Sequence, residues 1–165
     1  VCLVEQNDWT NEDWSEKGDI SELKHIFSGW HPEIQEILES TKPGSLYKWG
    51  LHDRAPMNVW SKGRFSLLGD AAHPMLPFIA QGAAMAIEDG IILASSLSSF
   101  DSVALGLNDY ENKRKYRTAK AQRTATRNAT IFHLSDFFAI FRNLVMKFFI
   151  KKIMDSFYKY DAISK

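Results

Sequence analysis

One segment of the chain places a carboxylate directly after a short apolar run. Residues 65–68 (Phe-Ser-Leu-Leu) lead straight to Gly69 and the ionisable Asp70. In α/β folds, ligands bind outside the carboxyl ends of strands, and a carboxylate placed there accepts strong hydrogen bonds from sugar-like hydroxyl groups. Gly69 would let the backbone turn sharply or approach a ligand closely. These residues therefore predict a hydroxyl-binding position at Asp70.

A helix that starts with small residues is expected shortly after this carboxylate. Pro74 and Pro77 stiffen the connection, and Gln81-Gly82-Ala83-Ala84 then opens the helix. The first N–H groups of a helix have no intrahelical partner, and the helix dipole places partial positive charge there. Small side chains would let a flat, electron-rich ring lie against these groups. The helix start thus predicts a site for a developing negative charge.

Each of these residues also has an ordinary structural interpretation. An Asp after a strand is commonly a turn or N-cap residue, and a lone His73 is more often a hydrogen-bonded structural histidine than a catalyst. The pair Glu88-Asp89 is typical of a solvated helix face. The combined spacing of the segment favours a functional site, although the sequence identifies no catalytic base.

The segment between Gly63 and Asp89 resembles the second flavin-binding motif of single-component FAD-dependent aromatic hydroxylases, in particular the salicylate hydroxylase-like branch. The matching residues are Gly63-Arg64, Leu67-Leu68-Gly69-Asp70-Ala71-Ala72-His73-Pro74, Pro77, Ala80-Gln81-Gly82 and Ile87-Glu88-Asp89. Weaker similarity extends over nearly the whole chain. It includes Phe27-Ser28-Gly29-Trp30-His31-Pro32, Lys48-Trp49, Asp53-Arg54, Tyr110-Glu111 with Arg114 and Arg117, and the residues 158–162.

This resemblance implies roles for individual residues. Asp70 would bind a ribityl hydroxyl of FAD, the amides at the helix start would face the pyrimidine side of the isoalloxazine, and the Pro77 carbonyl would lie near the reacting edge. It also implies NAD(P)H as co-substrate, O2, and a small aromatic acid such as salicylate or hydroxybenzoate as substrate. The positions assigned to the cofactor are Gly69, Asp70, Pro77, Gln81, Gly82, Ala83 and Ala84.

The chain also departs from the family pattern. Ala80 stands where many relatives have Gly, and Gly90 stands where Ala is usual. Gly is about 1 kcal/mol less favourable than Ala inside a helix. No G-x-G-x-x-G sequence occurs. We therefore expect a C-terminal fragment of an α/β flavin-binding fold that neither holds FAD tightly nor turns over alone. The expected parts are the end of a substrate region (1–58), the last FAD-domain strand and helix (59–98) and a C-terminal helical region (99–165).

Composition excludes several classes of protein. The 165 residues are 45% hydrophobic and 24% charged, which suits a globular chain with a sizeable core. Because 20 basic residues balance 20 acidic ones, no overall field attracts nucleic acid. The single Cys2 excludes an internal disulfide and fits a reducing compartment such as the cytoplasm. The five histidines lack metal-ligand spacing, so no metal site is expected.

The expected elements alternate between strands and helices. Strands are expected over residues 1–5, 46–53 and 65–68, the last of them buried. Short helices should begin near Ser21 and at Pro32, with a longer one over 83–97. A long helix capped by Asn108 or Asp109 should run to Arg127, followed by an apolar stretch over 131–149.

Other functions are compatible with parts of this pattern. Seven basic residues among positions 113–127 could bind phosphate, although a solvated helix face is the commoner meaning. The apolar segment 131–150 is interrupted by charges and should not span a membrane, but it could lie on a membrane surface, cover the core or join a homodimer. The same fold could also serve an epoxidase, an oxidase or a non-catalytic interaction module.

Overall fold

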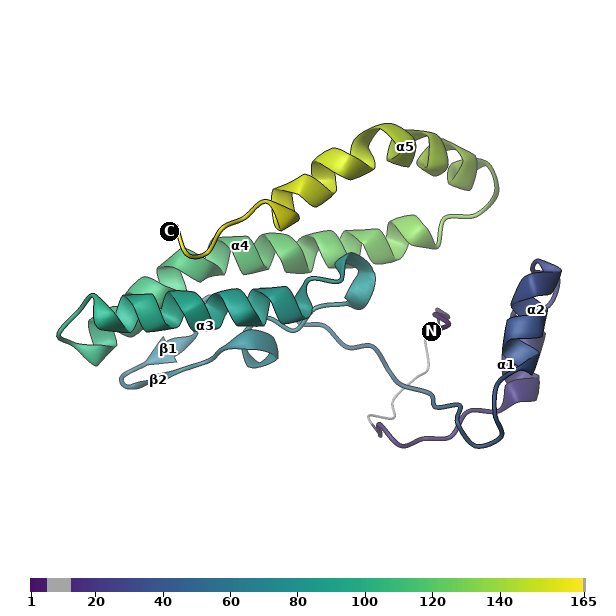
Figure 1. Cartoon of the computed structure of the whole chain (residues 1–165), viewed down its shortest axis with the longest axis horizontal. Coiled ribbons are helices and arrows are strands. Elements are labelled where there is room, and N and C mark those ends of the chain that lie inside the picture. Colours follow the sequence, from purple (N-terminus) through teal and green to yellow (C-terminus); the bar gives the residue numbers. More distant parts are fainter. Residues whose placement is uncertain (6–12, 165) are drawn as a thin grey trace. The chain divides into compact units, whose positions relative to one another are not determined.

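The computed structural model describes residues 1–5 and 13–164. The chain divides into two compact units, Val1–Leu51 and His52–Lys165. The first unit contains helices α1 (Ile20–Ile26) and α2 (Pro32–Glu39), and the second contains all the remaining elements (Figure 1).

The helices of the first unit begin at strong local start signals. Helix α1 begins near Ser21 as expected, although Asp19 caps it in place of Ser21, the capping residue that the sequence suggests; the Asp19 carboxylate accepts a hydrogen bond from the Ser21 amide at 2.7 Å. Helix α2 begins at Pro32 as expected, with the His31 imidazole accepting from the Glu33 amide at 3.3 Å.

Two expected strands are wrong in this unit. Residues 1–5 have no regular secondary structure, and the segment 46–53 forms only one isolated antiparallel bridge, between Lys17 and Tyr47. A strand needs a neighbour that takes up its N–H and C=O groups along its length. Within the described residues, the segment 46–53 makes only two backbone hydrogen bonds with a neighbouring segment, from Gly18 N to Leu46 O and from Lys48 N to Glu16 O.

The second unit begins with a short hairpin. Strands β1 (Ser61–Lys62) and β2 (Phe65–Ser66) pair antiparallel around a turn at Gly63-Arg64, as the sequence Lys62-Gly63-Arg64 predicts, and Gly63 has φ +63°. The strand expected over 65–68 is therefore shorter than predicted. It is also not buried, because Phe65 and Leu68 are exposed and only Leu67 packs against the core cluster around Ile92 and Tyr110.

Three helices form the bulk of the second unit. Helix α3 (Gly82–Ser98) lies beside α4 (Val103–Phe132), and α5 (Asp136–Tyr158) runs back in the opposite direction and meets α4 near its own C-terminal end, where Phe157 packs with Ala121 and Ala125 (Figure 1). The segment between β2 and α3 contains two 3₁₀ turns, η1 (Gly69–Ala71) against α3 and η2 (Pro77–Ile79) against α4. The hairpin and these turns are held against a framework of helices.

The expected start of the long helix is wrong. Helix α4 begins at Val103, after Ser102, and runs past Arg127 to Phe132. Asp109 lies inside it, where its carboxylate accepts a hydrogen bond from Ser96 Oγ at 2.7 Å and pairs with Lys113 at 2.9 Å. That carboxylate joins α3 to α4 and does not cap a helix.

The buried face of α4 is largely polar. It consists of Gly106, Leu107, Tyr110, Glu111, Arg114, Thr118, Ala119, Ala121, Gln122, Thr124 and Ala125. The basic residues at positions 113–127 were expected to form a solvated helix face, and this expectation is only partly correct. Lys113, Lys120, Arg123 and Arg127 are exposed, whereas Arg114 is fully buried and the Arg117 side chain is 12% exposed.

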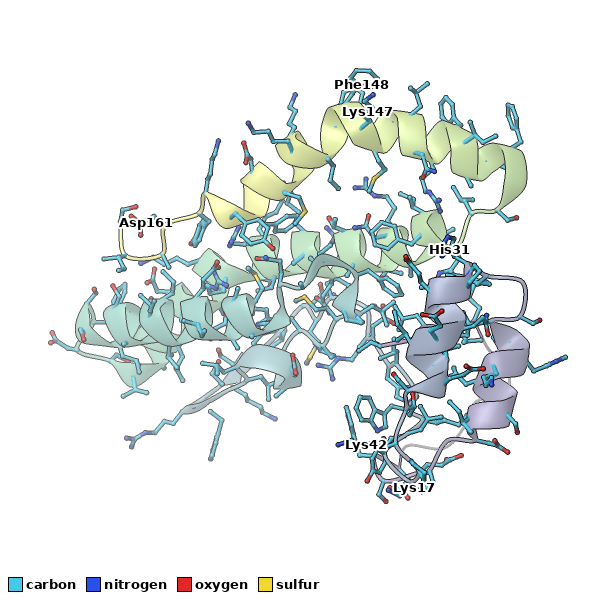
Figure 2. All side chains as sticks on the ribbon, turned by 45° about the vertical axis from the view of Figure 1, so that its right-hand side comes forward. Lys17, His31, Lys42, Lys147, Phe148 and Asp161 are labelled. Atoms are coloured by element: carbon cyan, nitrogen blue, oxygen red, sulfur yellow. The ribbon has the colours of Figure 1, made fainter. Side chains whose placement is uncertain are left out.

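The apolar stretch after α4 is broken at residues 133–135 and resumes as α5. The side of α5 that faces away from α4 carries Phe148 and Lys147 (Figure 2). Within the described residues, no helix combines the length and apolar character needed to cross a membrane.

Candidate functional site

The loop that contains Asp70 is folded by a left-handed glycine. Gly69 has φ +58°, and its carbonyl accepts from the amides of Ala72 and His73, each at 2.9 Å. A Cβ at this position would lie 3.3 Å from the Cβ of Ala86 on α3. Gly69 is therefore required both for the turn and for close packing on the helix.

Asp70 occupies the first position after this turn glycine. Its side chain is exposed, and it has no hydrogen-bond or ion-pair partner among the described residues. The carboxylate is thus available to a ligand, and its proposed contact with a hydroxyl group remains a prediction.

The start of α3 has the free donors that the sequence predicted. The N-cap residue Gln81 is buried, makes no capping bond with its side chain, and accepts the first intrahelical bond from Met85 N at 2.9 Å. The amides of Gly82, Ala83 and Ala84 therefore lack intrahelical partners. A Cβ at Gly82 would meet nothing within 4 Å, so the space beside these donors is open.

The turn before α3 is strained at Ala80. Ala80 has φ 50° and ψ 37°, a left-handed conformation that costs an L-residue about 1–2 kcal/mol. Its amide donates to the Pro77 carbonyl at 3.0 Å. The carbonyl expected near the reacting edge thus already accepts one hydrogen bond and retains one lone pair for another partner.

The structure brings the two predicted halves of the site to the same helix. Gly69 packs on Ala86, which lies one helical turn beyond Gly82. The loop that carries Asp70 and the open start of α3 are therefore neighbours along one side of this helix.

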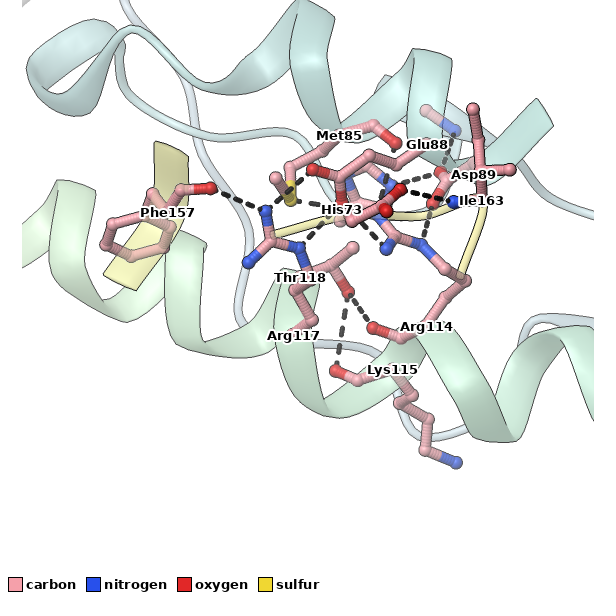
Figure 3. Close-up of polar contacts among 12 residues, drawn as sticks. His73, Met85, Glu88, Asp89, Arg114, Lys115, Arg117, Thr118, Phe157 and Ile163 are labelled. Atoms are coloured by element: carbon pink, nitrogen blue, oxygen red, sulfur yellow. Dashed lines mark hydrogen bonds and ion pairs between the residues drawn. The ribbon is translucent and has the colours of Figure 1, made fainter. Parts of the chain in front are cut away.

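A buried carboxylate holds the loop in this place (Figure 3). Asp89 Oδ2 accepts from the Gly69 amide at 3.0 Å and lies 2.6 Å from His73 Nε2, while Asp89 Oδ1 accepts from Arg114 Nε at 2.7 Å. Asp89, His73 and Arg114 are all fully buried. One side chain of α3 therefore ties both ends of the η1 turn and also binds α4.

The ion pairs continue from Asp89 to the end of α5. Arg114 Nη1 lies 2.8 Å from Glu88 Oε2, and Arg117 makes two hydrogen bonds of 2.6 Å to the same carboxylate. Arg117 also donates to the Phe157 carbonyl at 3.1 Å, and its guanidinium lies 3.8 Å from the centre of the Tyr160 ring. The network connects α3, α4 and the residues that follow α5.

These contacts favour the ionised form of Asp89 and the neutral form of Tyr110. Burial alone would raise the pKa of Asp89, but hydrogen bonds from His73, Arg114 and the Gly69 amide outweigh it and hold that pKa below its usual value. Burial, and then the charge on Asp89, raise the pKa of Tyr110. Because an ionised carboxylate only accepts, His73 donates from Nε2; within the described residues its buried Nδ1 has no partner.

Side chains of α4 also hold the loop, because they donate hydrogen bonds to the backbone carbonyls of the loop. Gln122 Nε2 donates to Pro74 O at 3.0 Å and to Arg54 O at 2.9 Å, and Asn128 Nδ2 donates to Phe78 O at 3.2 Å. Arg54 Nη2 in turn donates to Ala71 O at 2.8 Å. The polar face of α4 thus satisfies a loop that has little regular structure of its own.

Sequence reasoning included Asp89 and Arg114 in the family resemblance but gave neither a role, and took solvated helix faces as their ordinary meaning. A signal was available on α3. Asp89 lies at helical spacing between Met85 and Ile92, both buried, so a charged residue interrupts an apolar stripe. A charge at such a position requires a buried partner of opposite sign.

Within the part of the chain that the structure describes, no group of three or more His, Cys, Asp or Glu residues could hold a metal ion. The site is therefore built from a carboxylate, backbone amides and a buried ion-pair network.

A family model described as an FAD binding domain matches residues 4–125. The chain belongs to this FAD-binding family. Its relatives include 6-hydroxynicotinate 3-monooxygenase from Pseudomonas fluorescens (44% identical over 72% of the chain and 30% of the relative) and 3-hydroxybenzoate 6-hydroxylase from Klebsiella oxytoca (34% identical over 90% and 36%). The chain thus spans about a third of the length of these curated relatives.

Solved structures agree with the family assignment. A salicylate hydroxylase in complex with substrate matches 96% of the chain and 39% of its own, with 25% identity and a TM-score of 0.74. Klebsiella pneumoniae HpxO complexed with FAD and uric acid matches 84% and 37%, with 27% identity and a TM-score of 0.74. The expected resemblance and the α/β flavin-binding fold class are confirmed.

The buried pair Asp89–Arg114 generates a stability prediction for this member of the FAD-binding family. Arg114→Met keeps most of the side-chain volume but leaves the buried Asp89 without its arginine, whereas Glu88 retains Arg117. We expect the free energy of unfolding to fall by about 3–5 kcal/mol, as when one partner of a buried ion pair is removed. Urea denaturation of the chain measures this value.

Arg123→Met is the matched control, because Arg123 is an exposed arginine of the same helix with no ion-pair partner among the described residues. Its unfolding free energy should stay within about 0.5 kcal/mol of the parent value. Equal effects of the two substitutions would contradict the role given to Arg114.

Proposed function

We propose that this chain binds the ribityl chain and isoalloxazine ring of FAD, and that the full-length gene product is a monooxygenase that hydroxylates an aromatic acid with NAD(P)H and O2. The observation that carries the proposal is the exposed carboxylate of Asp70, which has no hydrogen-bond or ion-pair partner in the described part of the chain, on a loop that packs beside the open start of α3. Membership of the FAD-binding family supports it.

The residues present fit the cofactor in their chemistry. A ribityl chain offers hydroxyl donors, and Asp70 is a free carboxylate that only accepts when it is ionised. The isoalloxazine has electron-rich carbonyl groups on its pyrimidine side, and the amides of residues 82–84 are free donors at the positive end of a helix dipole. The absence of a side chain at Gly82 leaves room for a flat ring to approach them.

Each group would have a separate task in the reaction. When bound, FAD supplies the reaction with O2 and the transfer of one oxygen atom to the ring of the substrate. Asp70 would fix the cofactor through its hydroxyl groups, and the amides at the start of α3 would stabilise negative charge on the reduced ring. Pro77 and Gln81 would line the same end of the helix, and no catalytic base is assigned.

The names of the relatives narrow the substrate class. The first relatives act on 6-hydroxynicotinate and 3-amino-4-hydroxybenzoate, and others act on 3-hydroxybenzoate. These compounds share an electron-rich ring that carries a carboxylate and a hydroxyl group. We propose a substrate of this class, and we propose that residues 1–58 belong to a substrate region, 59–98 to the FAD domain and 99–165 to a helical region.

The cofactor contact is tested by Asp70→Ala in the full-length gene product. Losing a hydrogen bond to a charged group costs about 1.5–3 kcal/mol, so the Kd for FAD should rise by about ten- to a hundredfold. Fluorescence titration of FAD with the apoprotein measures it. Asp101→Ala, which removes an exposed carboxylate between α3 and α4, should leave the Kd unchanged. An unaltered Kd for Asp70→Ala would refute the role of Asp70.

The reaction class is tested with ¹⁸O2. We expect the full-length gene product, supplied with FAD, NADH or NADPH and either 6-hydroxynicotinate or 3-hydroxybenzoate, to place one ¹⁸O atom on the ring of the product. Mass spectrometry of the product measures this incorporation. Consumption of the nicotinamide with hydrogen peroxide as the only oxygen product, or formation of an epoxide, would instead support the oxidase or epoxidase alternatives.

A further inference from the structure

We propose that Asp89 is a positioning residue that sets where the carboxylate of Asp70 stands, an inference that rests on the proposed FAD site. Asp89 Oδ2 accepts from the Gly69 amide at 3.0 Å and from His73 Nε2 at 2.6 Å. These two donors flank Asp70 on either side along the chain. A single carboxylate oxygen therefore anchors both ends of the turn that presents Asp70.

The geometry of the turn transmits this anchoring to Asp70. The Gly69 carbonyl accepts from the amides of Ala72 and His73, so the anchored ends are also joined to each other. Asp70 itself is exposed, and its carboxylate has no hydrogen-bond or ion-pair partner among the described residues. Its position thus depends on its neighbours, and they depend on Asp89.

Asp89 is well placed to act through the loop and not on a ligand. Its side chain is fully buried on α3, the helix whose first amides form the other half of the proposed site. Arg114 Nε donates to its second oxygen at 2.7 Å, and Arg114 is itself held by Glu88 at 2.8 Å and by the Met85 carbonyl at 3.2 Å. Asp89 therefore fixes the hydroxyl-binding carboxylate relative to the helix start.

A double-mutant cycle separates positioning from a merely structural role. The Kd for FAD is measured by flavin fluorescence on the full-length gene product with Asp70→Ala, Asp89→Asn, and both. We expect Asp89→Asn to weaken binding about tenfold and the double variant to bind FAD no more weakly than Asp70→Ala, since Asp89 acts through Asp70. An unchanged Kd for Asp89→Asn, or a double variant that binds about tenfold more weakly than Asp70→Ala, would overturn the proposal.

Glu111→Gln is the matched control for lost stability. Glu111 is a buried carboxylate of α4 that accepts from the amides of Trp60 and Ser61 at 3.0 and 2.9 Å, so it anchors the hairpin and not the η1 turn. We expect it to lower the unfolding midpoint in urea without changing the Kd. A rise in Kd equal to that of Asp89→Asn would show a general effect of destabilisation and would overturn the proposal.

His73 provides a second route if Asp89→Asn does not fold. His73→Leu removes one anchor of the turn, whereas His73→Gln keeps an N–H donor for Asp89. We expect the Kd to rise about tenfold in the Leu variant and to be largely restored in the Gln variant; equal values would overturn the proposal. Failure of the unmodified protein to bind FAD would refute the proposed function itself, so the two failures are distinguishable.

Discussion

The charge on Asp89 constrains the second unit more than any other single group. A carboxylate removed completely from water is tolerated only when charged and hydrogen-bonding partners surround it. Here those partners come from three places: the Gly69 amide and His73 from the loop, and Arg114 from α4. Since all three must be present together, the loop, α3 and α4 can reach their native arrangement only as a set.

This constraint explains why α4 has a polar core face. Arg114 and Arg117 share Glu88, and Arg117 reaches the Phe157 carbonyl and the Tyr160 ring, so the C-terminal residues close over the same network. Gln122 binds loop carbonyls farther along the helix. A loop with few regular hydrogen bonds of its own needs such partners, and an apolar helix face could not supply them.

Local signals in the sequence predicted local structure well. The turn at Gly63-Arg64, the helix start at Pro32 and the helix over 83–97, observed as Gly82–Ser98, follow from glycine, proline and helical periodicity. The segments 1–5 and 46–53 were wrong because a strand depends on a partner that periodicity does not reveal. Asp89 and Arg114 were given no role because charged residues of a helix are ordinarily exposed, and the sequence does not show their 2.7 Å contact.

The claim that Asp89 holds the loop is tested most directly at the Gly69 amide. Hydrogen exchange followed by NMR on this chain should show this N–H as protected, and Asp89→Asn should speed its exchange at least about tenfold, because the acceptor loses its charge and its supports. The Met85 amide, bonded to Gln81 O within α3, should exchange as before. A Gly69 amide that exchanges at the unprotected rate in the unmodified chain would contradict the account.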